Sequence, residues 1–192
     1  MPAASPITIR RMRGSAQARA CARIMASSDP WLKLKRTFHQ NLRLLLDPTK
    51  EVYIAFCGRI LSGFVVLHVT GPFSGYLQCI AVAPESRGHG LGRQLIRFAE
   101  ERMFRESPNV FLCVSSFNDQ ARRLYARLGY RRVGEFKDYI VKGHSEILMR
   151  KTLGPWATFK RGAWRPRWLR SLAPMDRANG RKRSVFLGQS AS

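Results

Sequence analysis

The sequence predicts an α+β fold in which helices pack on a mixed, partly antiparallel sheet. Its strand and helix patterns follow the order β-α-α-β-β-β-α-β-α-β-β, which breaks the regular alternation of a parallel βαβ protein. Two segments rich in β-branched and aromatic residues flank Gly58-Arg59, so they predict an antiparallel hairpin. The 192 residues are 45% hydrophobic, which is enough for a folded core without disulfide bonds.

The first half of the chain predicts six elements. Residues 31–46 are predicted to form one helix, because apolar side chains recur every three or four positions and Pro48 follows. Those apolar residues are Trp31, Leu34, Phe38, Leu42 and Leu45. The other five elements are a strand at residues 7–9, a helix at 15–26, the two hairpin strands at 52–57 and 60–69, and a strand at 76–82 that ends before Pro84.

The second half alternates between helix and strand before it closes with two strands. Residues 91–105 place apolar side chains on one face and charged ones opposite, as in a helix that covers a sheet. Asn118 is a favourable N-cap for a helix that reaches Leu128, and Gly129 is a natural stop. The strands of this half are predicted at residues 110–114, 131–136 and 145–151.

The formal net charge of +22 divides the chain into unequal parts. Residues 1–50 carry 10 basic and 2 acidic side chains, residues 51–153 carry 15 and 9, and residues 154–192 carry 9 and 1. The last segment also lacks a helical or strand period and is rich in Gly and Pro. We therefore predict a domain over residues 1–153 and a basic, mostly extended tail over residues 154–192.

The tail has two open interpretations. Its tryptophans alternate with arginines, which is typical of segments that stack on bases and contact phosphates, so RNA or ribosome contact is one prediction. Packing of the same tryptophans onto the domain is the other. The residues concerned are Trp156, Trp164, Trp168, Arg161, Arg165, Arg167 and Arg170.

Cysteine spacing and hydropathy argue against several classes of protein. Cys21, Cys57, Cys79 and Cys113 are widely spaced without a CxxC pair, so we expect buried, reduced thiols in a cytoplasmic protein and no metal site. No segment approaches the roughly 18 apolar residues of a membrane-spanning helix, and no secretory leader is evident. The oligomeric state stays open.

The most informative segment is a glycine-rich loop between a predicted strand and a predicted helix. Gly88, Gly90 and Gly92 let the backbone approach a ligand closely, and the helix that follows offers free N–H groups. Together with Arg87 and Arg93, this arrangement predicts a phosphate site. The spacing fits neither the Walker pattern nor the dinucleotide pattern G-x-G-x-x-G.

This loop resembles that of the GNAT superfamily of acetyl-CoA-dependent N-acetyltransferases. Their pattern Arg/Gln-x-x-Gly-x-Gly/Ala fits residues 87–92, and Ile80-Ala81-Val82 with Pro84 resembles the adjoining strand. A second signature is similar over Asn118 and residues 124–130. The resemblance spans residues 7–151 and is nearest to the subgroup that acetylates ribosomal-protein alanine and other protein N-termini.

The resemblance implies a central sheet with helices on both faces and a splayed pair of strands, residues 76–82 and 110–114. It implies acetyl-CoA as cosubstrate and no metal. The backbone of Ile80, Ala81 and Val82 would bind pantetheine, and Asn118 would contact the cofactor or serve as a plain N-cap. The pyrophosphate would lie on the loop formed by Arg87, Gly88, His89, Gly90, Leu91, Gly92 and Arg93.

The resemblance also implies catalytic roles. Tyr125 matches the general acid that protonates the leaving thiolate, although its spacing also suits a helix face in the core. Related enzymes carry Glu at the position of Cys113, and a buried thiol is a poor base. His68, His144 or an ordered water are the alternatives for the base.

The acceptor stays open at this stage. In N-terminal acetyltransferases the matching hairpin, with an aromatic residue near the position of Tyr139, helps to hold the peptide. The resemblance therefore implies that Tyr139 and His144 bind the substrate, and it favours a protein α-amine as acceptor. A small amine, an amino sugar or a lysine side chain is the alternative, and the donor could carry a longer acyl group. A different class also fits, namely an RNA-binding or ribosome-binding protein with an inactive domain that still binds CoA.

Overall fold

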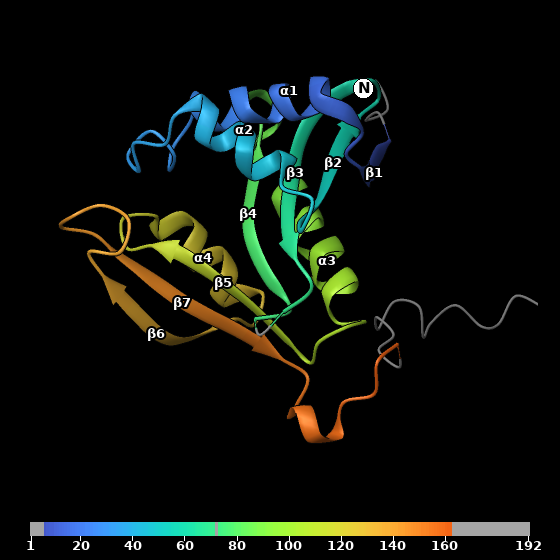
Figure 1. Ribbon diagram of the computed structural model, residues 1–192, viewed down its shortest axis with the longest axis vertical. Helices are drawn as coiled ribbons and strands as arrows, with labels where there is room; N and C mark the ends of the chain where they lie inside the picture. Colours follow the sequence, from blue (N-terminus) through green and yellow to red (C-terminus); the bar gives the residue numbers. More distant parts are fainter. Residues whose placement is uncertain (1–5, 72, 163–192) are drawn as a thin grey trace, which may run out of the picture.

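A computed structural model describes residues 6–71 and 73–162 (Figure 1). Within these residues seven strands form one sheet in the order β1-β2-β3-β4-β5-β7-β6, and neighbouring strands are antiparallel except β4 and β5. The predicted α+β fold is therefore confirmed. The strands are β1 (Ile7–Arg11), β2 (Glu51–Cys57), β3 (Ile60–His68), β4 (Tyr76–Val82), β5 (Asn109–Ser115), β6 (Arg131–Lys137) and β7 (Ser145–Thr152). The α-helices are α1 (Gly14–Ala26), α2 (Phe38–Leu46), α3 (Leu91–Met103) and α4 (Asp119–Arg127).

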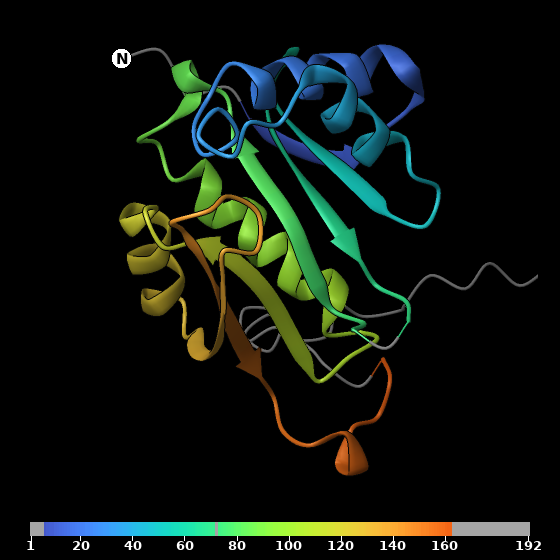
Figure 2. The same cartoon turned by 60° about the vertical axis from the view of Figure 1, so that its left-hand side comes forward.

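Helices cover both faces of the sheet, as the resemblance implied (Figure 2). Strand β3 shows why, because its side chains alternate between two apolar clusters. Phe64 and Val66 pack in the cluster that contains α1 and α2, whereas Val65 and Leu67 pack in the cluster that contains α3 and α4. All four side chains are fully buried, and each such burial stabilises the fold by about 1.5–3 kcal/mol.

The single helix predicted over residues 31–46 is wrong. Residues 31–35 form turns, and α2 begins only at Phe38. The reason is a capping box, in which Thr37 accepts a hydrogen bond from the Gln40 backbone and the Gln40 side chain accepts one from Thr37. Trp31 is nevertheless buried. The regular spacing of apolar residues from Trp31 onward therefore reflects burial in the core and not one continuous helix.

Strand β4 contains a bulge at Gln78. Cys79 lies opposite Val66 on β3 but Leu77 lies opposite Leu67, so Gln78 is one extra residue between the two pairs. A bulge of this kind bends the strand and changes which side chains face each side of the sheet. The bend falls where β4 meets the neighbouring strand β5.

Strands β4 and β5 separate directly after this point. Only Tyr76 and Leu77 of β4 pair with β5, opposite Phe111 and Leu112. Gly75 joins the two strands at their closed end, because its carbonyl accepts a hydrogen bond of 2.8 Å from the Phe111 N–H. The predicted splayed strand pair is therefore present, and it opens toward the C-terminal ends of both strands.

The described part of the tail leaves the sheet after β7. Residues Trp156–Thr158 form one 3-10 turn, and the Gly162 N–H donates to the Arg105 carbonyl over 2.9 Å. Trp164, Trp168 and the remaining basic residues lie outside the described residues. The boundary at residue 154 and the RNA contact of the tail therefore stay predictions.

Two further findings concern the described residues alone. All four cysteines are free thiols. None of the helices in residues 6–71 and 73–162 is both long and apolar enough to cross a membrane.

Gly75, in the turn before β4, is expected to tolerate replacement least among the described glycines. An added Cβ at Gly75 would lie 2.2 Å from the Asn109 carbonyl, and the residue has φ of +89°. We expect Gly75→Ala to lower the free energy of unfolding by about 2–4 kcal/mol through strain and overpacking. The matched control is Gly143→Ala, which has φ of +85° but nothing within 4 Å and should cost about 1 kcal/mol. Equal losses in denaturant unfolding would contradict the closed junction at Gly75.

Candidate active site

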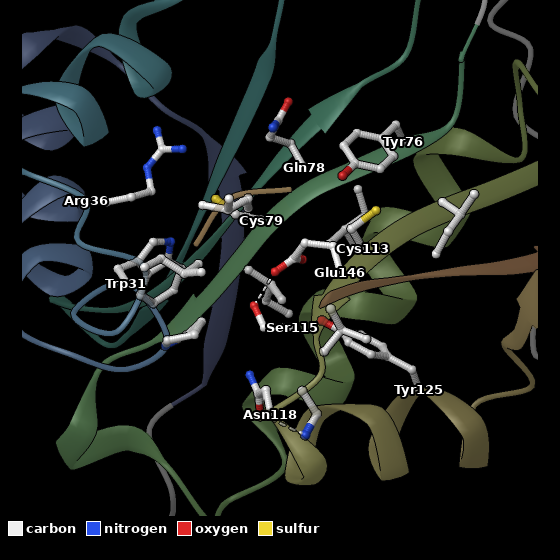
Figure 3. A pocket seen from close by; sticks show the side chains of 18 of the residues that line it. Trp31, Arg36, Tyr76, Gln78, Cys79, Cys113, Ser115, Asn118, Tyr125 and Glu146 are labelled. Carbon is white, nitrogen blue, oxygen red and sulfur yellow. Dashed lines mark hydrogen bonds between the residues drawn. The ribbon is translucent and has the colours of Figure 1, made fainter. Parts of the chain in front are cut away.

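A cavity of about 920 Å³ opens where β4 and β5 separate (Figure 3). Its walls come from β4 and the turn before it, β5, β7, α2, α3, α4, the segment between α1 and α2, and the β6–β7 hairpin. The side chains labelled in Figure 3 are Trp31, Arg36, Tyr76, Gln78, Cys79, Cys113, Ser115, Asn118, Tyr125 and Glu146. The cavity is therefore a direct consequence of the strand separation.

The β4 side of the cavity offers backbone groups. Beyond Leu77 the β4 edge that faces β5 has no strand partner, so its N–H and C=O groups can hydrogen-bond an extended ligand. Ile80 and Val82 also line the cavity with their side chains. The Ala81 side chain instead packs in the cluster under α1 and α2, so Ala81 can contribute only its backbone.

The glycine-rich loop lies at the N-terminus of α3. Gly88 and Gly90 have φ of +82° and +77°, and an added Cβ at either residue would meet nothing within 4 Å. The loop surface is therefore open to a ligand, and the first turn of a helix presents N–H groups without intrahelical partners. Leu91 is buried in the core, whereas Gly92 lines the cavity.

The charged residues of the loop are placed differently from one another. The Nε of Arg87 donates a hydrogen bond of 3.2 Å to the Val82 carbonyl, so this guanidinium braces the loop against β4. His89 and Arg93 are exposed. Of the predicted loop residues, only Gly92 is among those that line the cavity.

Asn118 and Tyr125 both line the cavity from α4. The Asn118 side chain accepts a hydrogen bond of 3.2 Å from the Ala121 N–H, which confirms it as the N-cap of α4. The Tyr125 ring is 6% exposed and packs edge-on against Tyr130. Burial raises the pKa of the Tyr125 hydroxyl above its ordinary value, so the phenol keeps its proton at neutral pH.

The structure adds Glu146, a residue that the sequence reasoning missed. Glu146 lies on β7, is 5% exposed, and lines the cavity. Its Oε1 accepts a hydrogen bond of 2.5 Å from the Ser115 hydroxyl. Burial raises the pKa of the Glu146 carboxyl, and the Ser115 hydrogen bond opposes this rise. The available sequence signal was a lone acid directly before the apolar run Ile147-Leu148-Met149.

The residues that the sequence analysis considered as general base, or as part of the acceptor site, do not all line the cavity. Cys113 lines the cavity together with Tyr76, and burial raises the pKa of its thiol. His68 lies at the end of β3 opposite Tyr76, and His144 packs on the Phe117 ring; neither lines the cavity.

Apolar side chains from two segments flank the mouth of the cavity. On the β6–β7 side Tyr139 is exposed and packs against Phe136 at 5.5 Å between ring centroids. Trp31 and Leu34 line the opposite side. Arg36 lies on that side as well, where its Nε donates to the Asn41 side chain over 3.2 Å.

The hydrogen-bonding groups of the site come from a strand edge and a helix N-terminus. Within the described residues no group of three or more His, Cys, Asp or Glu side chains could hold a metal. A free strand edge and an open glycine loop are instead suited to an extended amide chain that ends in phosphates.

Comparison with known proteins agrees with this geometry. The profile of the acetyltransferase (GNAT) family matches residues 18–130. The N-alpha-acetyltransferase RimI of Mycobacterium tuberculosis is 32% identical over 157 residues, which are 78% of this chain and 94% of that protein.

Two solved structures share the fold. The ribosomal-protein-S18-alanine N-acetyltransferase of Escherichia coli has a TM-score of 0.63 and 18% identity, and covers 78% of this chain and 96% of its own. The spermidine N-acetyltransferase of Vibrio cholerae in complex with CoA and spermine has a TM-score of 0.60 and 19% identity, over 76% and 95%. The family match extends over more than half of the sequence, and it includes both the loop and Tyr125. The chain therefore belongs to the acetyltransferase (GNAT) family, whose members use acetyl-CoA, and it is an N-acetyltransferase.

Proposed function

We propose that this protein transfers the acetyl group of acetyl-CoA to the α-amine of a protein N-terminus. The observation that carries the proposal is the cavity between β4 and β5, which has a backbone edge on one side and an apolar mouth on the other. The relative from Mycobacterium tuberculosis, an N-alpha-acetyltransferase by name, supports the same acceptor because the match extends over 94% of its length.

The charge of the cavity favours a peptide over a polyamine. A polyamine carries several positive charges and needs several carboxylates, whereas Glu146 is the one carboxylate among the described residues that line the cavity. Arg36 adds a positive charge to the same cavity. Apolar side chains that line the cavity, among them Trp31 and Tyr139, suit the first residues of a peptide.

The cofactor position follows from the free edge of β4 and the loop beyond it. The backbone of Ile80, Ala81 and Val82 would pair with the pantetheine amides, as an added strand does. The pyrophosphate would lie on the amides of residues 87–93, beside the positive end of the α3 dipole. Asn118 would contact the pantetheine from the opposite wall.

Tyr125 is proposed as the general acid. The amine nitrogen attacks the thioester carbonyl carbon, and N–H groups of the free β4 edge stabilise the oxyanion that forms. When the C–S bond breaks, its electron pair leaves on sulfur, and the Tyr125 hydroxyl supplies a proton to the thiolate. The raised pKa of Tyr125 supports this role because the phenol is protonated before the step.

Residues 1–153 are proposed to hold the whole reaction. All described residues that line the cavity fall between Pro30 and Leu148, so none of them comes from residues 154–162. Residues 154–192 would then take no part in the acetyl transfer itself.

The acceptor preference can be tested by mass spectrometry. With acetyl-CoA, peptides with a free α-amine should be acetylated at least 10-fold more efficiently, as kcat/KM, than spermidine or an amino sugar, because the cavity holds one carboxylate. The control is the same peptide with a blocked N-terminus and an internal lysine. Preferred modification of spermidine or of that lysine would contradict the proposal.

The loop position of the cofactor can be tested at Gly90. Gly90→Ala should weaken acetyl-CoA binding at least 10-fold by calorimetry, because a methyl group would project where phosphate approaches the backbone. Gly14→Ala is the matched control, since Gly14 has φ of +72° with nothing within 4 Å and does not line the cavity. Equal affinities of the two variants would place the pyrophosphate elsewhere.

The role of Tyr125 can be tested with Tyr125→Phe, which removes one oxygen and keeps the ring. We expect kcat to fall by about 10²–10⁴-fold while acetyl-CoA binding is kept, because the leaving thiolate loses its proton donor. Tyr130→Phe is the matched control, since that ring packs against Tyr125 but does not line the cavity. Unchanged turnover in Tyr125→Phe would contradict the role of Tyr125 as general acid and leave it only a role in packing.

A further inference from the structure

The cavity contains a carboxylate whose position depends on strand β7. Residues of β7 alternate, so Ile147 and Met149 pack in the core with α3 and α4, whereas Glu146 and Leu148 face the cavity. Ser115 lies opposite Glu146 on β5, and Cys113 lies opposite Leu148. The Glu146 carboxylate therefore lies diagonally across from Cys113 (Figure 3).

Glu146 differs from the other buried glutamate of the described residues. Glu100 is also buried, and its carboxylate forms an ion pair of 2.7 Å with Lys151. Among the described residues no Lys, Arg or His lies within ion-pair distance of Glu146, whose hydrogen-bond partner is the neutral Ser115. Burial of an acid without a cation costs free energy of folding. Buried acids of this kind are typical of sites that bind a ligand or catalyse a reaction.

We infer that Glu146 is the general base that removes a proton from the ammonium group of the acceptor. The inference rests on the proposed transfer to a primary amine. An ammonium group would supply the cation that the folded chain does not provide to Glu146. The carboxylate is thus both the binding partner of the ammonium and its proton acceptor.

The proton balance closes with the two residues. Glu146 takes one proton from R–NH₃⁺, and the neutral nitrogen bonds to the carbonyl carbon. The C–S bond breaks, and the sulfur takes a proton from Tyr125. The second proton on nitrogen returns to Tyr125 through water, and Glu146 then releases its own proton to solvent. The net products are the amide, CoA with a free thiol and one proton.

The other titratable groups that face Glu146 are unsuited to this step. Tyr76 from β4, Cys113 from β5 and Tyr125 from α4 have pKa values raised by burial, so each keeps its proton at neutral pH. Tyr139 approaches from the β6–β7 hairpin and Arg36 from the segment before α2. A guanidinium has hydrogen-bond donors and no acceptor, and the phenol of Tyr139 lies on an exposed side chain.

Ser115 is the positioning residue for Glu146. Its hydroxyl donates to one carboxylate oxygen and leaves the other oxygen for the ammonium group. The same hydrogen bond favours the ionised form and so lowers the pKa of Glu146. Loss of Ser115 should therefore move the pH at which the base becomes protonated upward.

The test measures kcat against pH for the full-length protein with a peptide acceptor. In the wild-type protein the rate should fall as the pH decreases through the pKa of Glu146, since the protonated acid cannot act as a base. Glu146→Gln should lower kcat by about 10²–10⁴-fold near neutral pH and recover as the pH rises, because the free amine then forms without a base. Ser115→Ala should move the acidic limb of the profile to higher pH.

Controls separate a base from a structural acid. Glu135→Gln removes an exposed carboxylate on the adjacent strand β6 and should leave the profile unchanged. Acetyl-CoA binding of Glu146→Gln should match the wild type, its unfolding temperature should be equal or higher because a buried charge is removed, and Glu146→Asp should restore part of the rate.

The possible outcomes are distinct. Wild-type turnover with an unchanged Glu146→Gln profile overturns the base and leaves the proposed function intact. A loss in Glu146→Gln that is equal at every pH, or that follows lost acetyl-CoA binding, makes Glu146 structural and also overturns the base. No amine acetylation by the wild-type protein overturns the proposed function and the base together.

Discussion

The separation of β4 from β5 after Leu77 is the constraint on which the rest of the site depends. Two pairs of residues hold the strands together at one end, where Gly75 allows the close approach to Asn109. The bulge at Gln78 then bends β4 away. A closed sheet at this point would satisfy every backbone group internally. The separated strands instead leave backbone N–H and C=O groups of β4 without strand partners, and a ligand in the cavity can hydrogen-bond to them.

The same opening brings together groups from opposite faces of the sheet. Tyr125 reaches the cavity from α4, on the face that α3 also covers, whereas Glu146 and Ser115 project from the face of α1 and α2. Burial raises the pKa of both Tyr125 and Glu146. The effect keeps the phenol protonated and makes the carboxylate a stronger base, so one physical cause suits the two opposite roles that we propose.

Local patterns predicted those features that depend on neighbouring residues. The hairpin at Gly58, the N-cap at Asn118 and the strand at residues 76–82 all appear in the structure, because turn geometry, capping and alternation act over a few residues. The prediction of one helix over residues 31–46 was wrong, because the apolar spacing reflected burial of Trp31 by tertiary packing. A pattern of apolar residues does not distinguish a helix from a turn that is packed equally well.

The sequence by itself determined the fold class, the position of the glycine loop before α3 and the helix that carries Tyr125, since each is encoded in a continuous segment with its own spacing. Only the tertiary structure decided which carboxylate enters the cavity. Ser115 and Glu146 are 31 residues apart in sequence and meet because β5 and β7 pair in one particular register. Strand pairing sets which side chains face each other across the sheet, and a shift of one residue would turn Glu146 to the other face.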